Sequence, residues 1–171
     1  MRELLLLRHA KSSRDEPAAG DHERDLARRG QRAVPQVGRL LRAEGIVPDL
    51  ALCSTATRAK RTWELAAAEL GREVPVRYLR TLYLAPPSRL LATVRQQTSD
   101  VGRLLLVGHN PGLHGLAMAL SGEGEPGLLA ALRAEFPTAA LARIAFDAAD
   151  WADVAAGAGR LLAYRRPRDG D

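Results

Sequence analysis

Three short apolar runs, each followed at once by polar residues, limit the folds open to this chain more than any other feature. The runs lie at residues 4–7, 48–53 and 102–108. A short continuous apolar run with turn-like flanks is typical of a strand that is buried on both faces of a parallel sheet. The sequence therefore predicts that these segments are buried strands of one parallel sheet.

Helical periodicity separates the predicted strands. Apolar residues recur at helical spacing in three sets, namely Val34, Val37 and Leu41, then Ala59, Trp63, Ala66 and Leu70, then Leu113, Leu116, Ala117 and Leu120. Pro35 conflicts with the first set, because proline inside a helix removes a hydrogen bond and clashes with the preceding turn. We therefore expect this helix to begin late, with Pro35 in its first turn.

The other elements give weaker signals. Residues 74–78 predict a strand, residues 88–97 a helix, and residues 139–146 and 160–164 late strands that run antiparallel at an edge. Segments 20–24 and 122–127 are loop-like in their glycine, proline and acidic residues. Strands that alternate with helices indicate an α/β fold. The length of 171 residues suits one domain, which we place at residues 1–165, with a polar C-terminal tail at 166–171.

Composition argues against several classes of protein. No apolar run approaches the roughly 20 residues of a membrane span, so no membrane partner is expected. The apolar stretch after Met1 is too short for a secretory signal. The single cysteine, Cys53, forbids an internal disulfide and offers no thiolate cluster for zinc, which suits a reducing compartment. The expected localisation is cytoplasmic.

The chain is basic, with a formal net charge of +5 and a pI near 10.1. Only Lys11 and Lys60 among its 25 basic residues are lysines, and the arginines are scattered along the chain. No basic run is interleaved with aromatic residues, which make up 4% of the chain. We therefore expect solvated basic faces and no nucleic acid partner, while anionic substrates remain attractive.

An arginine and a histidine directly follow the first predicted strand. This strand ends at Leu7, and Arg8 and His9 come next. In open parallel sheets, ligands bind at the carboxyl ends of the strands. Arg8 and His9 are thus candidates for a binding or catalytic site, although such a pair alone fits an incidental role equally well.

The second predicted strand leads into a helix start that suits an anion. Ser54 or Thr55 is a plausible N-cap, and Arg58 falls in the opening turn. The free N–H groups and the dipole at a helix start attract anions. The guanidinium of Arg58 adds a planar fork of donors that matches phosphate oxygens. Lys60 and Arg61 are expected to form an exposed basic face rather than to bind the anion.

The third predicted strand ends in a second histidine. His109 follows it, and Asn110 and Pro111 suit the cap and the first position of the next helix. If the three strands are neighbours, Arg8, His9, Arg58 and His109 converge at one edge of the sheet. This convergence predicts a phosphate site.

The segments that carry these residues resemble the signature blocks of the histidine phosphatase superfamily. The blocks are LLRHA at 6–10, STATRA at 54–59 and VGHNPG at 107–112. The chain is most similar to the compact phosphohistidine phosphatase SixA branch, through RHAKSS at 8–13, ERDLARRG at 23–30 and FPTAAL at 136–141. The family usually has proline at the position of Asp25. The resemblance spans almost the whole chain and implies a three-layer α/β/α sandwich around a mostly parallel sheet, the phosphoglycerate mutase-like fold.

The resemblance also implies a mechanism. His9 would be the nucleophile that carries the phosphoryl group, and Arg8, Arg58 and His109 would surround and bind that group. An unprotonated imidazole can attack, while the cationic partners stabilise the oxygens of an in-line transition state. Neither a metal nor another cofactor is expected. The expected substrate is a phosphorylated protein or a small phosphorylated molecule, and the oligomeric state stays open.

One departure bears on the substrate. Larger members of the superfamily that cleave alkyl phosphates protonate the leaving oxygen with an acidic residue, and residues 81–86 contain no Asp or Glu. This absence favours phosphohistidine or activated esters, whose leaving groups depart more readily. Four acidic residues that follow the first strand could still supply the proton, namely Asp15, Glu16, Asp21 and Glu23. An open pocket that admits a protein side chain is expected.

The other polar and aromatic candidates have simpler interpretations. Ordinary loop or surface roles are expected for Lys11, Ser12, Ser13 and Arg24, and His22 is expected to be a solvated loop residue. A capping or packing role is expected for His114, and packing roles for Trp63 and Trp151.

Four rival functions also fit parts of the sequence. A cysteine-dependent phosphatase would need one residue more than the four that separate Cys53 from Arg58, so Cys53 is expected to be a small buried apolar residue. A sugar phosphomutase would want a general acid and a longer substrate cap. A phosphomonoesterase acting on small or aryl phosphates and a non-catalytic phosphate-binding module both remain alternatives.

Overall fold

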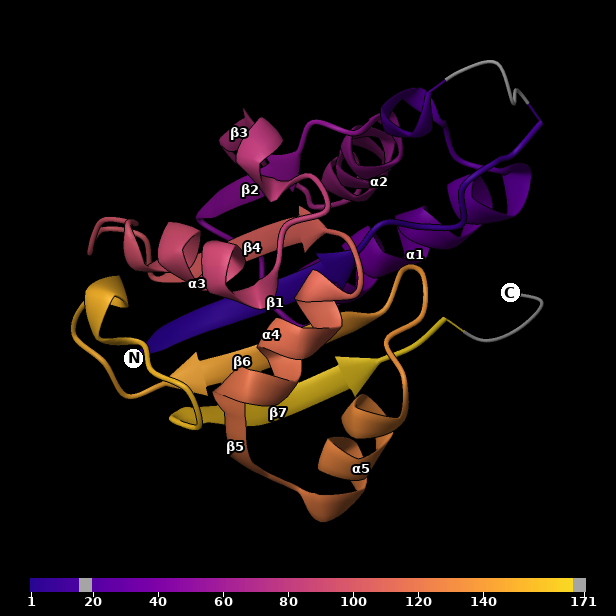
Figure 1. Cartoon of the computed structure of the whole chain (residues 1–171). Helices are drawn as coiled ribbons and strands as arrows, with labels where there is room; N and C mark the ends of the chain where they lie inside the picture. The colour runs from indigo at the N-terminus through magenta and orange to yellow at the C-terminus, as the bar shows by residue number, and fades with distance from the viewer. Residues whose placement is uncertain (16–19, 168–171) are drawn as a thin grey trace.

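The computed structural model describes residues 1–15 and 20–167, and its described strands form one seven-stranded sheet (Figure 1). The order across the sheet is β3-β2-β4-β1-β6-β7-β5. The strands are β1 (Arg2–Arg8), β2 (Leu50–Ser54), β3 (Val76–Leu79), β4 (Arg103–Gly108), β5 (Ser121–Gly124), β6 (Leu141–Phe146) and β7 (Gly159–Arg165).

Helices cover both faces of the sheet, which gives the three layers that the resemblance implied. The α-helices are α1 (Arg28–Ala43), α2 (Thr57–Ala67), α3 (Pro87–Arg95), α4 (Gly112–Leu120) and α5 (Pro126–Ala134), and the 3-10 helices are η1 (Asp21–Glu23), η2 (Arg80–Leu82) and η3 (Trp151–Asp153). Leu5 and Leu7 of β1 pack in one cluster with residues of α1 and α2. Leu4 and Leu6 face the other side, in a cluster with residues of α3, α4 and α5. Alternate side chains of β1 thus face opposite layers of helices. Because both faces of this strand are buried, its run is apolar throughout.

The sheet is mixed but mostly parallel. The strands β3, β2, β4 and β1 run parallel to one another, while β6 runs antiparallel to both β1 and β7. The three predicted core strands are thus direct neighbours, in the order β2, β4, β1. The late strands are antiparallel as expected, but they do not form the edge, because β5 lies outside β7.

The prediction for α1 was wrong at its start. The helix begins at Arg28, so Pro35 lies in its interior rather than in its first turn. Interior proline costs roughly 3 kcal/mol, and tertiary packing offsets this cost. The helix buries Val34 and Leu41, and a Cβ added to Gly38 would lie only 2.2 Å from the carbonyl oxygen of Ala66, which shows how closely α1 approaches α2.

The prediction of a loop at 122–127 was also wrong. It contains β5, which pairs parallel with β7, and then the start of α5. A Cβ on Gly122 would meet the carbonyl oxygen of Gly157 at 1.9 Å, so this glycine permits a close backbone approach rather than a flexible turn. Glu125 caps α5, with its carboxylate accepting from the N–H groups of Gly127 and Leu128.

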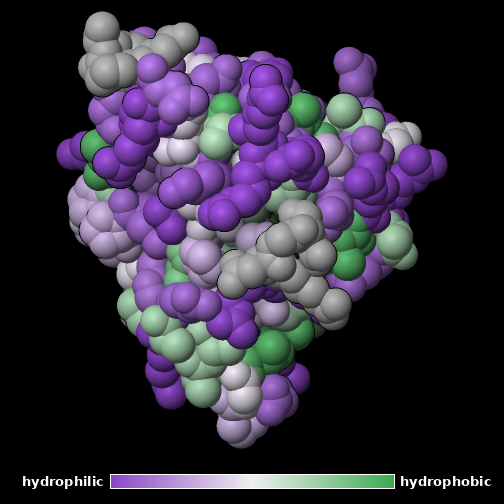
Figure 2. Space-filling model, turned by 90° about the vertical axis from the view of Figure 1, so that its right-hand side faces the viewer, coloured by the Kyte–Doolittle hydropathy of each residue, from purple (hydrophilic) through white to green (hydrophobic). Residues whose placement is uncertain are grey.

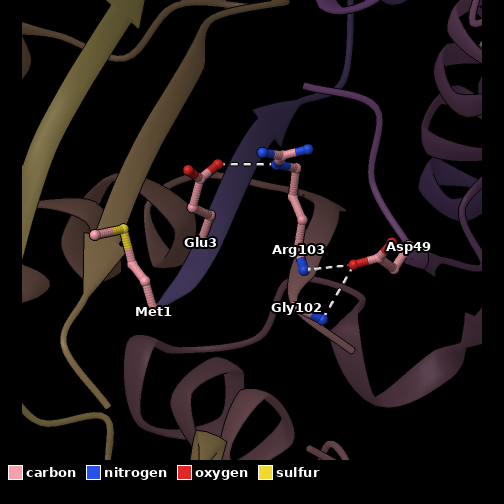
Figure 3. Close-up of a pocket in the computed structure, with 5 residues that line it drawn as sticks. All are labelled: Met1, Glu3, Asp49, Gly102 and Arg103. Carbon is pink, nitrogen blue, oxygen red and sulfur yellow. Dashed lines mark hydrogen bonds and ion pairs between the residues drawn. The ribbon is translucent and has the colours of Figure 1, made fainter. Parts of the chain in front are cut away.

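An ion-pair network ties together the amino ends of the central strands (Figure 3). The carboxylate of Glu3 accepts from Nε of Arg103 at 2.8 Å and also from Nη2 of Arg143 at 2.8 Å. Burial acts to raise the pKa of Glu3, but the hydrogen bonds and charges of Arg143 and Arg103 outweigh it and lower that pKa. Asp49 accepts from the backbone N–H groups of Gly102 and Arg103. A cavity of about 230 Å³ lies here, lined by charged groups that already satisfy one another.

Candidate active site

The three predicted motifs meet at the carboxyl edge of the sheet. Arg8 at the end of β1 pairs with Gly108 at the end of β4, and Cys53 of β2 pairs with Val107. The arrowheads of β1 and β4 point to the same side of the molecule in Figure 1. Figure 2 views the molecule from that side and shows hydrophilic side chains gathered over its upper part.

The ring of His9 is held in one orientation and one tautomer. His9 is only 6% exposed, and its Nδ1 lies 2.8 Å from the carbonyl oxygen of Ala10, so Nδ1 carries the proton and donates it. The Nε–H of Arg58 donates to Nε2 of His9 at 3.4 Å. Nε2 therefore carries an available lone pair. Burial, followed by the charges of Arg58 and Arg8, lowers the pKa of His9 to about 4, although the bond to Ala10 acts to raise it.

Two guanidinium groups concentrate positive charge beside His9. The side chain of Arg58, in the first turn of α2, is only 3% exposed, and Arg8 is half-buried. Nη1 of Arg8 donates to the carbonyl oxygen of Phe136 at 3.2 Å. Nε of Arg8 is buried, and within the part of the chain that the structure describes it has no hydrogen-bond partner. A buried donor without a partner is costly, which points to a ligand at this position.

His109 forms the opposite side of the site. Its ring centroid lies 5.2 Å from that of His9, and its Nε2 lies 2.7 Å from the hydroxyl oxygen of Ser54. Its Nδ1 is buried and, among the residues described, lacks a partner. Burial first, then the charges of His9 and Arg58, lower the pKa of His109 to about 3. The two rings are thus neutral near pH 7.

A third group of side chains closes the outer rim. Asp21 in η1 accepts from Nη2 of Arg58 at 3.0 Å and from the hydroxyl of Tyr83. The ring of Tyr83 lies edge-on to His109, with centroids 5.4 Å apart, and edge-on to His22, with centroids 4.8 Å apart. Nε2 of His22 lies 2.8 Å from the hydroxyl oxygen of Thr55. These contacts link η1 to the start of α2.

The prediction for His22 was therefore wrong. The side chain is 22% exposed and lies against Tyr83 rather than free in solvent. The prediction for His114 agrees with the structure, since its Nε2 lies 2.6 Å from the carbonyl oxygen of Leu132 and its ring stacks on Phe136. The prediction for the start of α4 was one residue early, because the helix begins at Gly112 with Pro111 as its N-cap, although the side-chain oxygen of Asn110 still accepts from the N–H of His114.

The remaining candidates of the sequence have surface, loop or core roles. Lys11 is exposed, and the hydroxyl of Ser12 accepts from Nη1 of Arg24. The hydroxyl of Ser13 accepts from the N–H of Asp15. Glu16, one of the four acidic candidates, falls outside the described residues. The two tryptophans, Trp63 and Trp151, are buried as expected.

Cys53 is unsuited to nucleophilic chemistry. It is fully buried in β2, and burial raises the pKa of its thiol far above the usual range. The structure thus agrees with the prediction of a small buried residue.

The sequence did not predict how three residues take part in the site. Ser54 was predicted only as a helix cap, Tyr83 was given no role, and Asp21 was predicted only as one of four possible proton donors. Their signal is weak in the sequence, because each reaches the site through a tertiary contact.

Two features are absent from the described residues. Residues 1–15 and 20–167 contain no group of three or more His, Cys, Asp or Glu side chains arranged to hold a metal ion. No helix in the same residues is long and apolar enough to cross a membrane.

Comparisons with known proteins give consistent matches. The model of the histidine phosphatase superfamily (branch 1) matches residues 4–83. An uncharacterized protein of Mycobacterium tuberculosis is 38% identical over 164 residues, which cover 95% of this chain and all of the relative.

Solved structures extend the match over the whole fold. A protein of Nakamurella multipartitia that carries the name phosphohistidine phosphatase SixA is 30% identical, with a TM-score of 0.83 over 97% of this chain and 96% of that one. A protein histidine phosphatase SixA complexed with tungstate is 22% identical, with a TM-score of 0.75 over 95% of both chains.

Proposed function

The chain belongs to the histidine phosphatase superfamily, and from this premise we propose that it hydrolyses phosphohistidine in proteins through a covalent phosphoryl group on His9. It is a phosphatase of this superfamily and resembles SixA proteins in structure. We infer the substrate, and the roles of the residues that act on it, from the geometry of the site.

One observation carries the proposal. Nε2 of His9 accepts from Nε of Arg58, and two nitrogens of the neighbouring side chains, Nε of Arg8 and Nδ1 of His109, are buried without a partner among the described residues. A phosphoryl oxygen would satisfy Nε of Arg8, and it would satisfy Nδ1 of His109 when that nitrogen carries the ring proton. The tungstate ion bound by a SixA protein of the same fold is an oxyanion of similar charge.

In the first step, His9 Nε2 attacks the phosphorus in line with the leaving group. The new P–N bond forms as the bond to the leaving nitrogen breaks, and the leaving imidazole keeps that electron pair and takes a proton from water. Arg8 and Arg58 stabilise the equatorial oxygens. The hydrogen bond from Nδ1 to Ala10 fixes the ring and stabilises the positive charge that it gains.

His109 acts as a donor from the other side. When the hydroxyl of Ser54 donates to Nε2 of His109, the proton of the neutral ring stays on Nδ1, which then donates to the phosphoryl group. In the second step, water attacks the phosphorus, the P–Nε2 bond breaks, and its electron pair returns to His9. The proton that this water loses goes to solvent and neutralises the hydroxide left by the first step. The guanidinium groups supply the positive charge that a metal ion supplies in other phosphatases.

The residues at the outer rim favour a substrate whose leaving group departs without a proton from an acidic side chain. The hydrogen bond from Tyr83, followed by that from Arg58, lowers the pKa of Asp21 to about 2. Asp21 is therefore ionised at neutral pH and has no proton to give an alkoxide. Imidazole is a better leaving group, which favours phosphohistidine over alkyl phosphates.

The test compares three substrates without added metal: a phosphohistidine peptide, an aryl phosphate and a sugar phosphate. We expect turnover of the first two, weak turnover of the third, and none with His9→Ala. Efficient turnover of the sugar phosphate alone would refute the proposed substrate. Activity retained by His9→Ala would refute the proposed nucleophile.

A further inference from the structure

Asp21 lies on the outer side of the guanidinium of Arg58. Its side chain is 48% exposed, against 3% for Arg58. One carboxylate oxygen accepts from Nη2 of Arg58, and the backbone oxygen of Asp21 accepts from Nη1. The other carboxylate oxygen lies 3.1 Å from Nη2 of Arg24. Asp21 thus accepts hydrogen bonds from two arginines, Arg24 and Arg58, at the solvent-exposed edge of the site.

The leaving group must depart toward this edge. His9 is buried and approaches the phosphorus from inside the molecule, and an in-line displacement places the leaving group on the far side of the phosphorus. Arg58 donates from Nε to His9 and from Nη1 and Nη2 to Asp21, so Asp21 lies beyond the guanidinium as seen from His9, on the side that is more exposed to solvent. A charge on the leaving group would therefore meet the carboxylate of Asp21.

We propose that Asp21 is a specificity residue that disfavours substrates with an anionic leaving group and so favours neutral or cationic ones such as imidazole. The proposal rests on the proposed function and adds the charge of the leaving group to it. Asp21 acts in two ways. Its own charge repels an anionic leaving group, and its hydrogen bonds engage the outward donors of Arg24 and Arg58, which would otherwise attract one.

The charge of the phosphoryl group does not affect the comparison between substrates. Every substrate carries the same phosphoryl charge, so its repulsion from Asp21 is common to all of them. Two substrates that differ only in the charge of the leaving group therefore isolate the contribution of Asp21. The low pKa of Asp21 means that the carboxylate stays charged throughout the neutral range.

The experiment uses two phosphorylated imidazoles as matched substrates. One is N-phosphoryl imidazole-4-acetamide, with a neutral leaving group, and the other is N-phosphoryl imidazole-4-acetate, with an anionic one. The measured quantity is the ratio of kcat/KM for the neutral compound to kcat/KM for the anionic compound. We expect the wild-type chain to prefer the neutral compound and Asp21→Asn to lower the ratio by roughly three- to tenfold, as Coulomb interaction across a few ångströms of solvated protein predicts.

Glu23→Gln is the matched control. It removes the same charge from the same 3-10 helix, but the Glu23 side chain is 64% exposed and pairs with His22 rather than with Arg58. We expect this variant to leave the ratio within about twofold of the wild-type value. Tyr83→Phe is a second test, because it removes a hydroxyl that holds Asp21, and it should lower the ratio in the same direction.

The outcomes separate the two proposals. An unchanged ratio in Asp21→Asn, or an equal change in Glu23→Gln, overturns the role of Asp21 while turnover itself upholds the proposed function. A loss of kcat/KM that is the same for both compounds would assign Asp21 a purely structural role and also overturn the inference. If the wild-type chain cleaves neither compound, the proposed function fails, and the role of Asp21 fails with it.

Discussion

The protonation state of His9 gives a sharp test of the site. Burial and the charges of Arg58 and Arg8 lower the pKa of His9 to about 4, whereas an ordinary histidine titrates near 6.5. At pH 5.5 a group with a pKa of 4 is roughly 97% neutral, and one with a pKa of 6.5 is roughly 9% neutral. His9 should therefore present about ten times more free nucleophile at this pH than an unperturbed histidine would.

NMR of the chain with 15N-labelled histidine measures this directly. We expect the His9 ring to hold its proton on Nδ1 and to remain neutral from pH 8 down to about pH 5. His9→Gln assigns the resonances by removing them. Inorganic phosphate should raise the pKa of His9, because a bound anion favours the imidazolium form. A pKa near 6.5 in the empty site, or a proton on Nε2, would refute the account of His9.

Three further predictions concern the rest of the chain. Because the pKa of His9 is lower in the folded chain than in the unfolded one, its contribution to stability is full above pH 6.5 and is lost as pH falls from 6.5 through about 4. His109 acts in the same direction, so the quantity to measure is the difference in free energy of unfolding between the wild-type chain and His9→Gln, which urea unfolding should show to change by about 3 kcal/mol over this range. Gly38→Ala should lower the free energy of unfolding by about 1–3 kcal/mol despite the better helix propensity of alanine, because the new Cβ lies 2.2 Å from a backbone oxygen; a gain in stability would contradict this packing. Cys53→Ala should keep kcat/KM within about twofold and cost about 1 kcal/mol of stability, so a dead but folded variant would revive the cysteine mechanism.

The central part of the fold was predictable because its signals are local. The apolar runs that became β1, β2 and β4 carry no alternation, which marks strands buried on both faces. The polar residues that follow them then had to share one edge, once the strands were neighbours. The sequence alone therefore predicted that four residues converge at this edge, namely Arg8, His9, Arg58 and His109. The structure places them together. Their roles in catalysis remain predictions.

The errors arose where tertiary packing overrides local preference. Pro35 is a helix breaker in isolation, but the packing of α1 on α2 keeps it inside the helix. Gly122 reads as a loop residue, whereas it allows β5 to approach Gly157. Asp21 and Tyr83 reach the site through contacts between segments about sixty residues apart, which no local pattern encodes. Contacts of this kind depend on the folded arrangement of η1 and the segment after η2.

Trapping the phosphorylated chain tests the central claim most directly. The chain is mixed with a radiolabelled phosphohistidine peptide, quenched in alkaline detergent after milliseconds to seconds, digested and mapped by mass spectrometry. The account predicts an alkali-stable, acid-labile phosphoryl group on the peptide that contains His9, and none in His9→Ala. A phosphoryl group on another residue, or turnover without any labelled protein at any quench time, would contradict it.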